Sequence, residues 1–156
     1  MSISITDKLI SLGHKMPEAP APVANYVATV RVGNLLFVSG QVSPREPTSA
    51  APGQVGAELN IDQGQQAAQA AALGVLAQIS AATNGQISAV RRIVRLGVFV
   101  ASTPQFTQHP EVANGASNLI AAVFGDTGRH ARTAVGVASL PRGAVVEVEA
   151  IVELED

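Results

Sequence analysis

Residues 128–137 read GRHARTAVGV, and residues 145–154 read VVEVEAIVEL after a Leu-Pro pair at 140–141. Both stretches are rich in small and β-branched side chains, which predicts two adjacent β-strands near the C-terminus. Arg132 opens the first of these strands, and no carboxylate follows it there. Because a desolvated charge without a partner is costly, we expect an anionic group to meet Arg132.

The second stretch alternates strictly between apolar and acidic side chains. Alternation places residues 146, 148, 150, 152 and 154 on one face of the strand, while Glu147, Glu149 and Glu153 lie on the other. The apolar face predicts a place in the core. From spacing alone, Glu147 is more simply a solvated strand residue than a catalytic one, and Arg132 has two open roles: binding a ligand, or pairing with Glu147 or Glu149.

Composition limits the class of protein. A chain of 156 residues with 47% hydrophobic content fits a single domain, residues 1–156. A net charge of -2, with one tyrosine, four phenylalanines and no tryptophan, gives no basic or aromatic surface for nucleic acid or for an anionic membrane. The absence of cysteine excludes disulfides, and residues 1–12 lack the features of a signal peptide, so we expect a cytoplasmic protein.

The order of predicted elements defines the fold class. Thr6 as N-cap and Gly13 bracket a short helix, which with the Pro-rich linker at 17–22 makes an N-terminal helical extension over 1–22. The remaining signals, in chain order, are a hairpin of strands 26–32 and 35–42, a loop at 44–56, a helix from N-cap Asp62 to 84–85, a strand at 92–100, a helix from Pro104 or Pro110 to Gly125, and the two C-terminal strands. This order predicts an α+β fold, a mixed sheet with two helices on one face.

The second face of that sheet is apolar as well. In strands 35–42, 92–100 and 133–137, residues of both parities are mostly hydrophobic. A monomer would expose a patch larger than soluble monomers usually carry, so we expect the chain to form an oligomer.

Three blocks of sequence, in order, resemble one family. Asn25-Tyr26 is followed, thirteen residues after the tyrosine, by Ser39-Gly40-Gln41, and the chain ends in the two strands described above. These blocks resemble the Rid family, also called the YjgF/YER057c/UK114 or endoribonuclease L-PSP family, over residues 26–151. The resemblance implies a chorismate-mutase-like fold, a homotrimer with sites between subunits, and hydrolytic deamination of small enamines and imines, such as 2-aminoacrylate and 2-iminopropanoate, to 2-keto acids and ammonia, with no cofactor.

The resemblance also assigns roles to residues. Arg132 would hold the substrate carboxylate, and Glu147 would position or activate the attacking water. Tyr26, Ser39 and Gly40 would line the substrate site. The family's helix asparagine corresponds to Asn114 or to Asn118, of which we favour Asn114.

One position departs from the family pattern. Ala134 stands where the well-known deaminases have cysteine, so only its backbone N–H and C=O are left to contact substrate. Arg129 and His130 would add positive charge to the cleft.

Other functions have less support. His14, His109 and His130 lack metal-ligand spacing, and neither a phosphate-binding loop nor a catalytic triad stands out, so we expect no metal site. A non-catalytic trimer that binds a small carboxylate or acts as a regulatory partner remains the alternative. Ribonuclease activity is disfavoured because the chain has few basic and aromatic residues.

Overall fold

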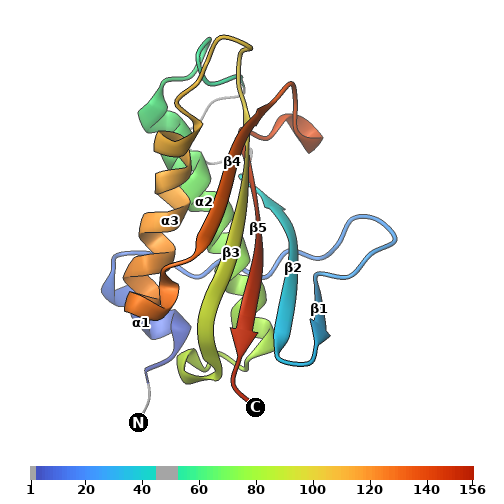
Figure 1. Cartoon of the computed structure of the whole chain (residues 1–156), viewed down its shortest axis with the longest axis vertical. Helices are drawn as coiled ribbons and strands as arrows, with labels where there is room; N and C mark the ends of the chain where they lie inside the picture. The colour runs from blue at the N-terminus through green and yellow to red at the C-terminus, as the bar shows by residue number, and fades with distance from the viewer. Residues whose placement is uncertain (1–2, 45–52) are drawn as a thin grey trace.

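The structure is a computed structural model that describes residues 3–44 and 53–156. Its described part contains one five-stranded sheet and three α-helices (Figure 1). The elements are α1 (Ile5–Ser11), β1 (Thr29–Val32), β2 (Leu35–Val42), α2 (Ile61–Ala82), β3 (Val90–Ala101), α3 (His109–Phe124), β4 (Ala131–Val137) and β5 (Val146–Leu154). Most of the loop predicted at 44–56 lies outside the described residues.

The sheet has the mixed topology that the element order predicts. Its strand order is β1-β2-β5-β3-β4, with β3 and β4 parallel and the other neighbours antiparallel. The two C-terminal strands, predicted to be adjacent, are therefore separated by β3, which pairs with both. The predicted hairpin is confirmed: Val32 pairs with Leu35 across a two-residue turn in which Gly33 has a φ of 58°. The first strand begins at Thr29, so Tyr26 precedes it.

Helices α2 and α3 cover the same face of the sheet, as predicted (Figure 1). The apolar residues of β5 at 146, 148, 150, 152 and 154 are all buried beneath the helices. The helix ends differ from the sequence prediction. The N-cap of α2 is Asn60 rather than Asp62, because the Asn60 side chain accepts from the backbone N–H of Gln63 in a reciprocal capping box. Helix α3 starts at His109 with Pro110 in its first turn, so Pro104 lies outside it.

The N-terminal extension contains the expected helix, but its cap is Ser4 rather than Thr6. Ser4 Oγ accepts from the backbone N–H of Asp7, and the Asp7 carboxylate accepts from Ser4 in return. Ile5 and Leu9 are fully buried, and the helix contacts both α2 and α3. The extension is therefore part of the core, and residues 12–28 lead from it to the sheet without helix or strand.

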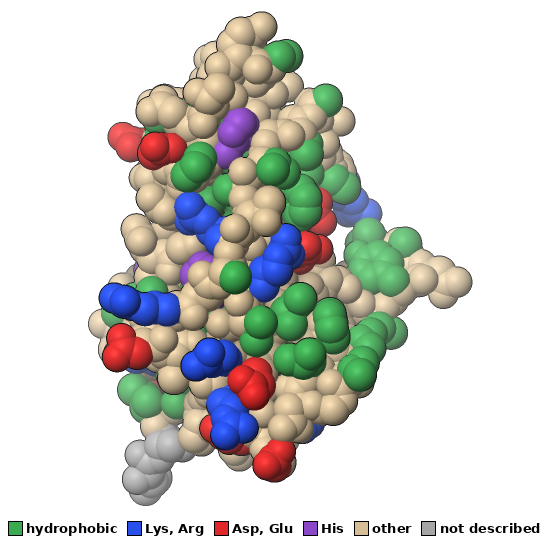
Figure 2. Space-filling view, viewed as in Figure 1, with side chains coloured by type: hydrophobic (Ala, Val, Ile, Leu, Met, Phe, Trp, Pro, Cys, Tyr) green, Lys and Arg blue, Asp and Glu red, His purple; other side chains and the backbone are tan. Residues whose placement is uncertain are grey.

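The opposite face of the sheet is open and partly apolar. Hydrophobic side chains gather over β1 and β2 in Figure 2. The exposed hydrophobic residues that the strands present on this face are Val30, Val32, Leu35, Phe37, Val42 and Val135. The prediction of a second apolar face therefore holds over β1 and β2, whereas Glu147 and the Arg95–Glu149 pair make the centre of this face charged. The chain's own helices cover only the other face. Within the described residues, no helix has the length and apolarity needed to cross a bilayer.

Candidate functional site

Arg132, on β4, reaches across to α3. Its strand partner is Leu96, a fully buried core residue, so the Arg132 side chain leaves the sheet on the helix-covered face. Nη1 donates to Asn114 Oδ1 at 2.9 Å and to Ser117 Oγ at 3.1 Å, and Nη2 donates to the Pro110 carbonyl at 3.3 Å. Helix α3 therefore supplies three neutral acceptors for one guanidinium.

This arrangement holds the guanidinium without neutralising it. Among the described residues, these three bonds leave two of the five N–H donors without an acceptor: Nε–H and one hydrogen on Nη2. Nε and Nη2 are the neighbouring nitrogens that can bond the two oxygens of a carboxylate. No carboxylate in the described part of the chain pairs with Arg132; its alternative partner Glu149 instead lies 3.3 Å from Arg95. The positive charge of Arg132 is therefore available to a ligand.

The structure separates the two candidate asparagines. Asn114 contacts Arg132, whereas no hydrogen bond joins Asn118 to it. Sequence analysis missed Ser117, although it lies three residues after Asn114 and therefore shares its helix face. Ala134 follows Arg132 on the same face of β4 and is partly buried.

His130 and Arg129 differ in their surroundings. Arg129 is exposed and lies 4.0 Å from the Asp126 carboxylate. His130 is half-buried, with Nε2 2.9 Å from Ser117 Oγ and Nδ1 2.6 Å from the Gly128 carbonyl oxygen. Burial lowers the pKa of His130, and the positive charge of Arg132 lowers it further. The hydrogen bond to the Gly128 carbonyl acts in the opposite direction but is a smaller effect than burial. The ring is therefore neutral at pH 7, so of these two residues only Arg129 carries a positive charge.

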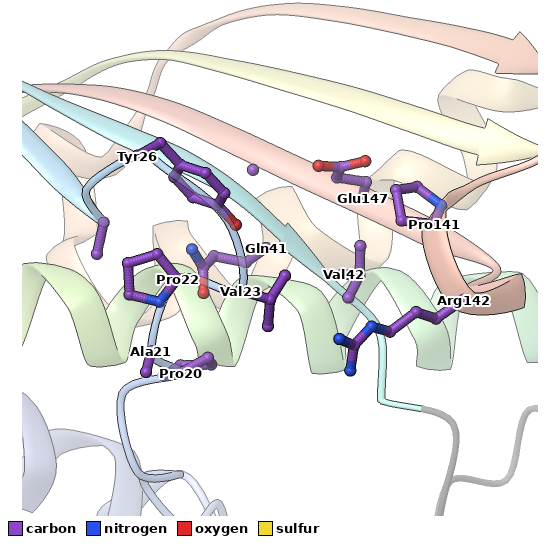
Figure 3. A pocket seen from close by; sticks show the side chains of 12 residues that line it. Pro20, Ala21, Pro22, Val23, Tyr26, Gln41, Val42, Pro141, Arg142 and Glu147 are labelled. Carbon is purple, nitrogen blue, oxygen red and sulfur yellow. The ribbon is translucent and has the colours of Figure 1, made fainter.

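A pocket of about 400 Å³ lies beside the second half of β2 (Figure 3). It is lined by Pro20, Ala21, Pro22, Val23, Tyr26, Ala28, Gly40, Gln41, Val42, Pro141, Arg142 and Glu147. Half of the lining residues come from the segment before β1 and are mostly apolar, while Tyr26, Gln41, Arg142 and Glu147 supply polar groups. Three of the predicted residues, Tyr26, Gly40 and Glu147, therefore share one pocket.

Glu147 reaches this pocket because Gly40 has no side chain. A Cβ at Gly40 would collide with the Glu147 carboxylate, which lies directly over the glycine. Partial burial raises the pKa of Glu147, and the negative charge of Glu149 raises it further. A carboxyl group with a raised pKa exchanges protons closer to neutral pH, as a general acid or base requires.

The other predicted residue of this region has a structural contact. Ser39 Oγ donates to the Val27 carbonyl at 2.8 Å, which ties β2 to the segment before β1, and Ser39 does not line the pocket. Sequence analysis also missed Arg142, which lines the pocket with a φ of 59°. The Leu-Pro turn ahead of an Arg-Gly pair was its only signal.

The predicted residues thus form two groups that do not meet within one chain. Arg132, Asn114 and Ala134 lie on the helix-covered side at β4, an edge strand. Glu147 leaves β5 on the open side, because its neighbours Val146 and Val148 point into the core. Among the described residues, no three His, Asp or Glu side chains cluster as metal ligands do.

Comparison with known proteins identifies the family. The family model described as endoribonuclease L-PSP matches residues 16–154, so the chain belongs to the L-PSP or Rid family. It is 51% identical to protein TCP17 of Trypanosoma cruzi, over 97% of this chain and 95% of that protein. The crystal structure of Atu1372 from Agrobacterium tumefaciens, a protein of unknown function, superposes with a TM-score of 0.87 at 47% identity, over 97% of this chain and 94% of that one.

A relative with a named activity is more distant. The 2-iminobutanoate/2-iminopropanoate deaminase of Dermatophagoides farinae is 29% identical over 89% of this chain and 93% of that protein.

Proposed function

We propose that this protein hydrolyses small 2-imino acids, of the 2-iminopropanoate and 2-iminobutanoate type, to 2-keto acids and ammonia. The observation that carries the proposal is the environment of Arg132, whose guanidinium is held by three neutral acceptors with two adjacent N–H donors left over. Such an arrangement suits a carboxylate, which every 2-imino acid carries, and so supports the proposal. Membership in a family with a named imine deaminase supports the same substrate class.

The complete site would form between two chains of a homotrimer. One chain would supply Arg132 and Asn114, and a neighbour would supply the pocket of Tyr26, Gly40 and Glu147. The apolar residues on the open face support this assembly, because a second copy would cover them.

The chemistry makes modest demands on the protein. Water adds to the electrophilic imine carbon to give a carbinolamine, the C–N bond then breaks, and ammonia leaves as the carbonyl forms. Glu147 accepts a proton from the attacking water and passes it to the imine nitrogen; it then carries the hydroxyl proton of the carbinolamine to the same nitrogen as the carbonyl forms, so both water protons leave with ammonia, and its raised pKa suits this exchange. Arg132 holds the substrate carboxylate throughout, so the reacting carbon keeps its place relative to the water.

A keto-acid release assay on freshly generated imines from several amino acids tests the proposal. Faster release of keto acid than in buffer, and loss of the acceleration in Arg132→Ala, are the expected results. An intact assembly that binds 2-oxobutanoate without accelerating hydrolysis would favour the non-catalytic carboxylate-binding alternative.

We expect the protein to be a trimer in solution at micromolar concentration. Multi-angle light scattering after size exclusion measures this directly. A stable monomer would contradict the assembly and, with it, a site shared between chains.

Glu147→Gln is expected to reduce kcat with little change in KM, since the amide keeps the size of the side chain and removes its proton exchange. The same substitution should stabilise the fold at pH 7. Folding raises the pKa of Glu147, so the charged carboxylate destabilises the native state as pH rises above the unfolded value of about 4.3. The stability advantage of the glutamine variant should therefore vanish below about pH 4, which denaturant titrations across this range can check. An unchanged kcat in Glu147→Gln would show that Glu147 has no role in proton transfer.

RNA binding should be weak near physiological salt, although the family carries the endoribonuclease name. The chain has a net charge of -2, and Arg91 and Arg95 of β3 lie beside Glu153 and Glu149, so little uncompensated positive charge is available to gain from counterion release. Filter binding or fluorescence anisotropy over a salt series is the measurement. Tight binding with a steep salt dependence would contradict this expectation.

A further inference from the structure

We propose that His130 and Ser117 are positioning residues for Arg132: His130 fixes the direction of the Ser117 hydroxyl, which in turn holds one edge of the guanidinium so that its other edge faces the ligand. The inference rests on the proposed role of Arg132 as the carboxylate-binding group. Neither residue touches the substrate in this scheme.

The hydrogen-bond partners of His130 determine its tautomer. The Gly128 carbonyl oxygen can only accept a hydrogen bond, so Nδ1, 2.6 Å away, carries the ring proton. In a neutral imidazole the other nitrogen is then an acceptor, and Nε2 takes the hydroxyl hydrogen of Ser117 at 2.9 Å. His130 therefore acts as an acceptor toward α3.

The direction of the Ser117 hydroxyl follows from this tautomer. Its single hydrogen points at His130, so the oxygen presents its lone pairs to Arg132 Nη1 at 3.1 Å. The relay runs from Arg132 through Ser117 and His130 to the Gly128 carbonyl, with each group donating to the next. Because every hydrogen bond in this relay donates in the same direction, the guanidinium has one favoured orientation.

The relay requires a neutral His130. A protonated ring would place a second cation next to Arg132, and its Nε2–H would no longer accept from Ser117. Burial and the charge of Arg132 both lower the pKa of His130, which keeps the acceptor in place at pH 7. Arg129 and Asp126, in the exposed turn before β4, lie 4.0 Å from each other.

Two substitutions of His130, with amide side chains of different length, distinguish a positioning role of the residue from a role in packing alone. In His130→Asn the side-chain amide ends near the place of Nδ1, so it keeps the Gly128 contact and loses the acceptor for Ser117. In His130→Gln the amide extends to the place of Nε2, so an acceptor for Ser117 can be retained. Ser117→Ala removes the relay itself, and Ser88→Ala, an exposed serine before β3, is its matched control.

The readouts are the Kd of 2-oxobutanoate by calorimetry and the melting temperature, both on the full chain in its native assembly. We expect His130→Asn and Ser117→Ala to weaken binding about tenfold, as loss of one well-placed hydrogen bond implies. His130→Gln should stay within about threefold of the unsubstituted protein. The double variant His130→Asn/Ser117→Ala should bind no more weakly than Ser117→Ala alone, because both changes break one relay.

Nitrogen NMR of His130 gives an independent test. A protonated Nδ1 and a bare Nε2 at pH 7 are expected, and the opposite tautomer would overturn the proposal. Two binding results would also overturn it. One is that His130→Asn and Ser117→Ala bind 2-oxobutanoate as tightly as the unsubstituted protein. The other is that His130→Asn and His130→Gln lose affinity only in proportion to their loss of melting temperature.

The Arg132→Ala variant distinguishes the two levels of inference. If Arg132→Ala binds 2-oxobutanoate as well as the unsubstituted protein does, the proposed carboxylate site is wrong. If Arg132→Ala loses binding while His130→Asn keeps it, only the positioning role of His130 is wrong.

Discussion

Arg132→Ala is expected to abolish nearly all affinity for 2-keto and 2-imino acids, a loss of about 2 to 5 kcal/mol for removing one partner of a desolvated charge pair. Arg132→Lys should lose much of the affinity as well. An ammonium keeps the charge, but it lacks the planar fork that bonds Asn114 and Ser117 on one side and a carboxylate on the other. Titration with 2-oxobutanoate measures both effects.

The stability of these variants is the control. Because no carboxylate of the described chain pairs with Arg132, the alanine variant should remain a folded oligomer with a similar melting temperature. Full affinity in such a folded Arg132→Ala protein would end the carboxylate-binding hypothesis. A large thermal destabilisation would show that the guanidinium has a structural role instead.

Gly115→Ala is expected to destabilise the protein by about 1 to 3 kcal/mol, although alanine favours helices. A Cβ at Gly115 would collide with the backbone of α2 at the Gln65 carbonyl, and backbone cannot move aside as a flexible side chain can. The two helices approach closely here, since Gln65 Nε2 also donates to the Glu111 carbonyl of α3 at 2.7 Å. Denaturant unfolding of the assembled protein is the measurement.

Ala122→Gly provides the matched control for helix propensity. Ala122 is an exposed alanine of the same helix, so its replacement reports the glycine penalty in α3 alone, about 1 kcal/mol. If Gly115→Ala stabilised the protein by that amount, the close contact between α2 and α3 would be wrong. Since Gly115 adjoins Asn114, a shift of α3 should also weaken carboxylate binding.

Local patterns predicted much of the fold. Alternation in β5, the Gly33-Asn34 turn and the Ala-rich stretch of α2 each depend on residues close together in the chain, and the structure confirms all three. Helix ends were less accurate, because capping depends on which polar side chain completes a reciprocal pair. Ser4 with Asp7 and Asn60 with Gln63 do so, whereas Thr6 and Asp62 do not.

The candidate site was predictable in its residues but not in its arrangement. Sequence alone identified Arg132 as a charge without a local carboxylate and Glu147 as an acidic residue on an alternating strand, and the fold class followed from the order of elements. Only the tertiary structure placed Arg132 and Glu147 on opposite faces of the sheet, selected Asn114 over Asn118, and joined Ser117 and His130 to the guanidinium. These outcomes depend on the register of β4 against β3 and on the rotation of α3 about its axis. Both are set by core contacts between residues distant in sequence, such as Leu96 beneath the helices, which no local pattern records.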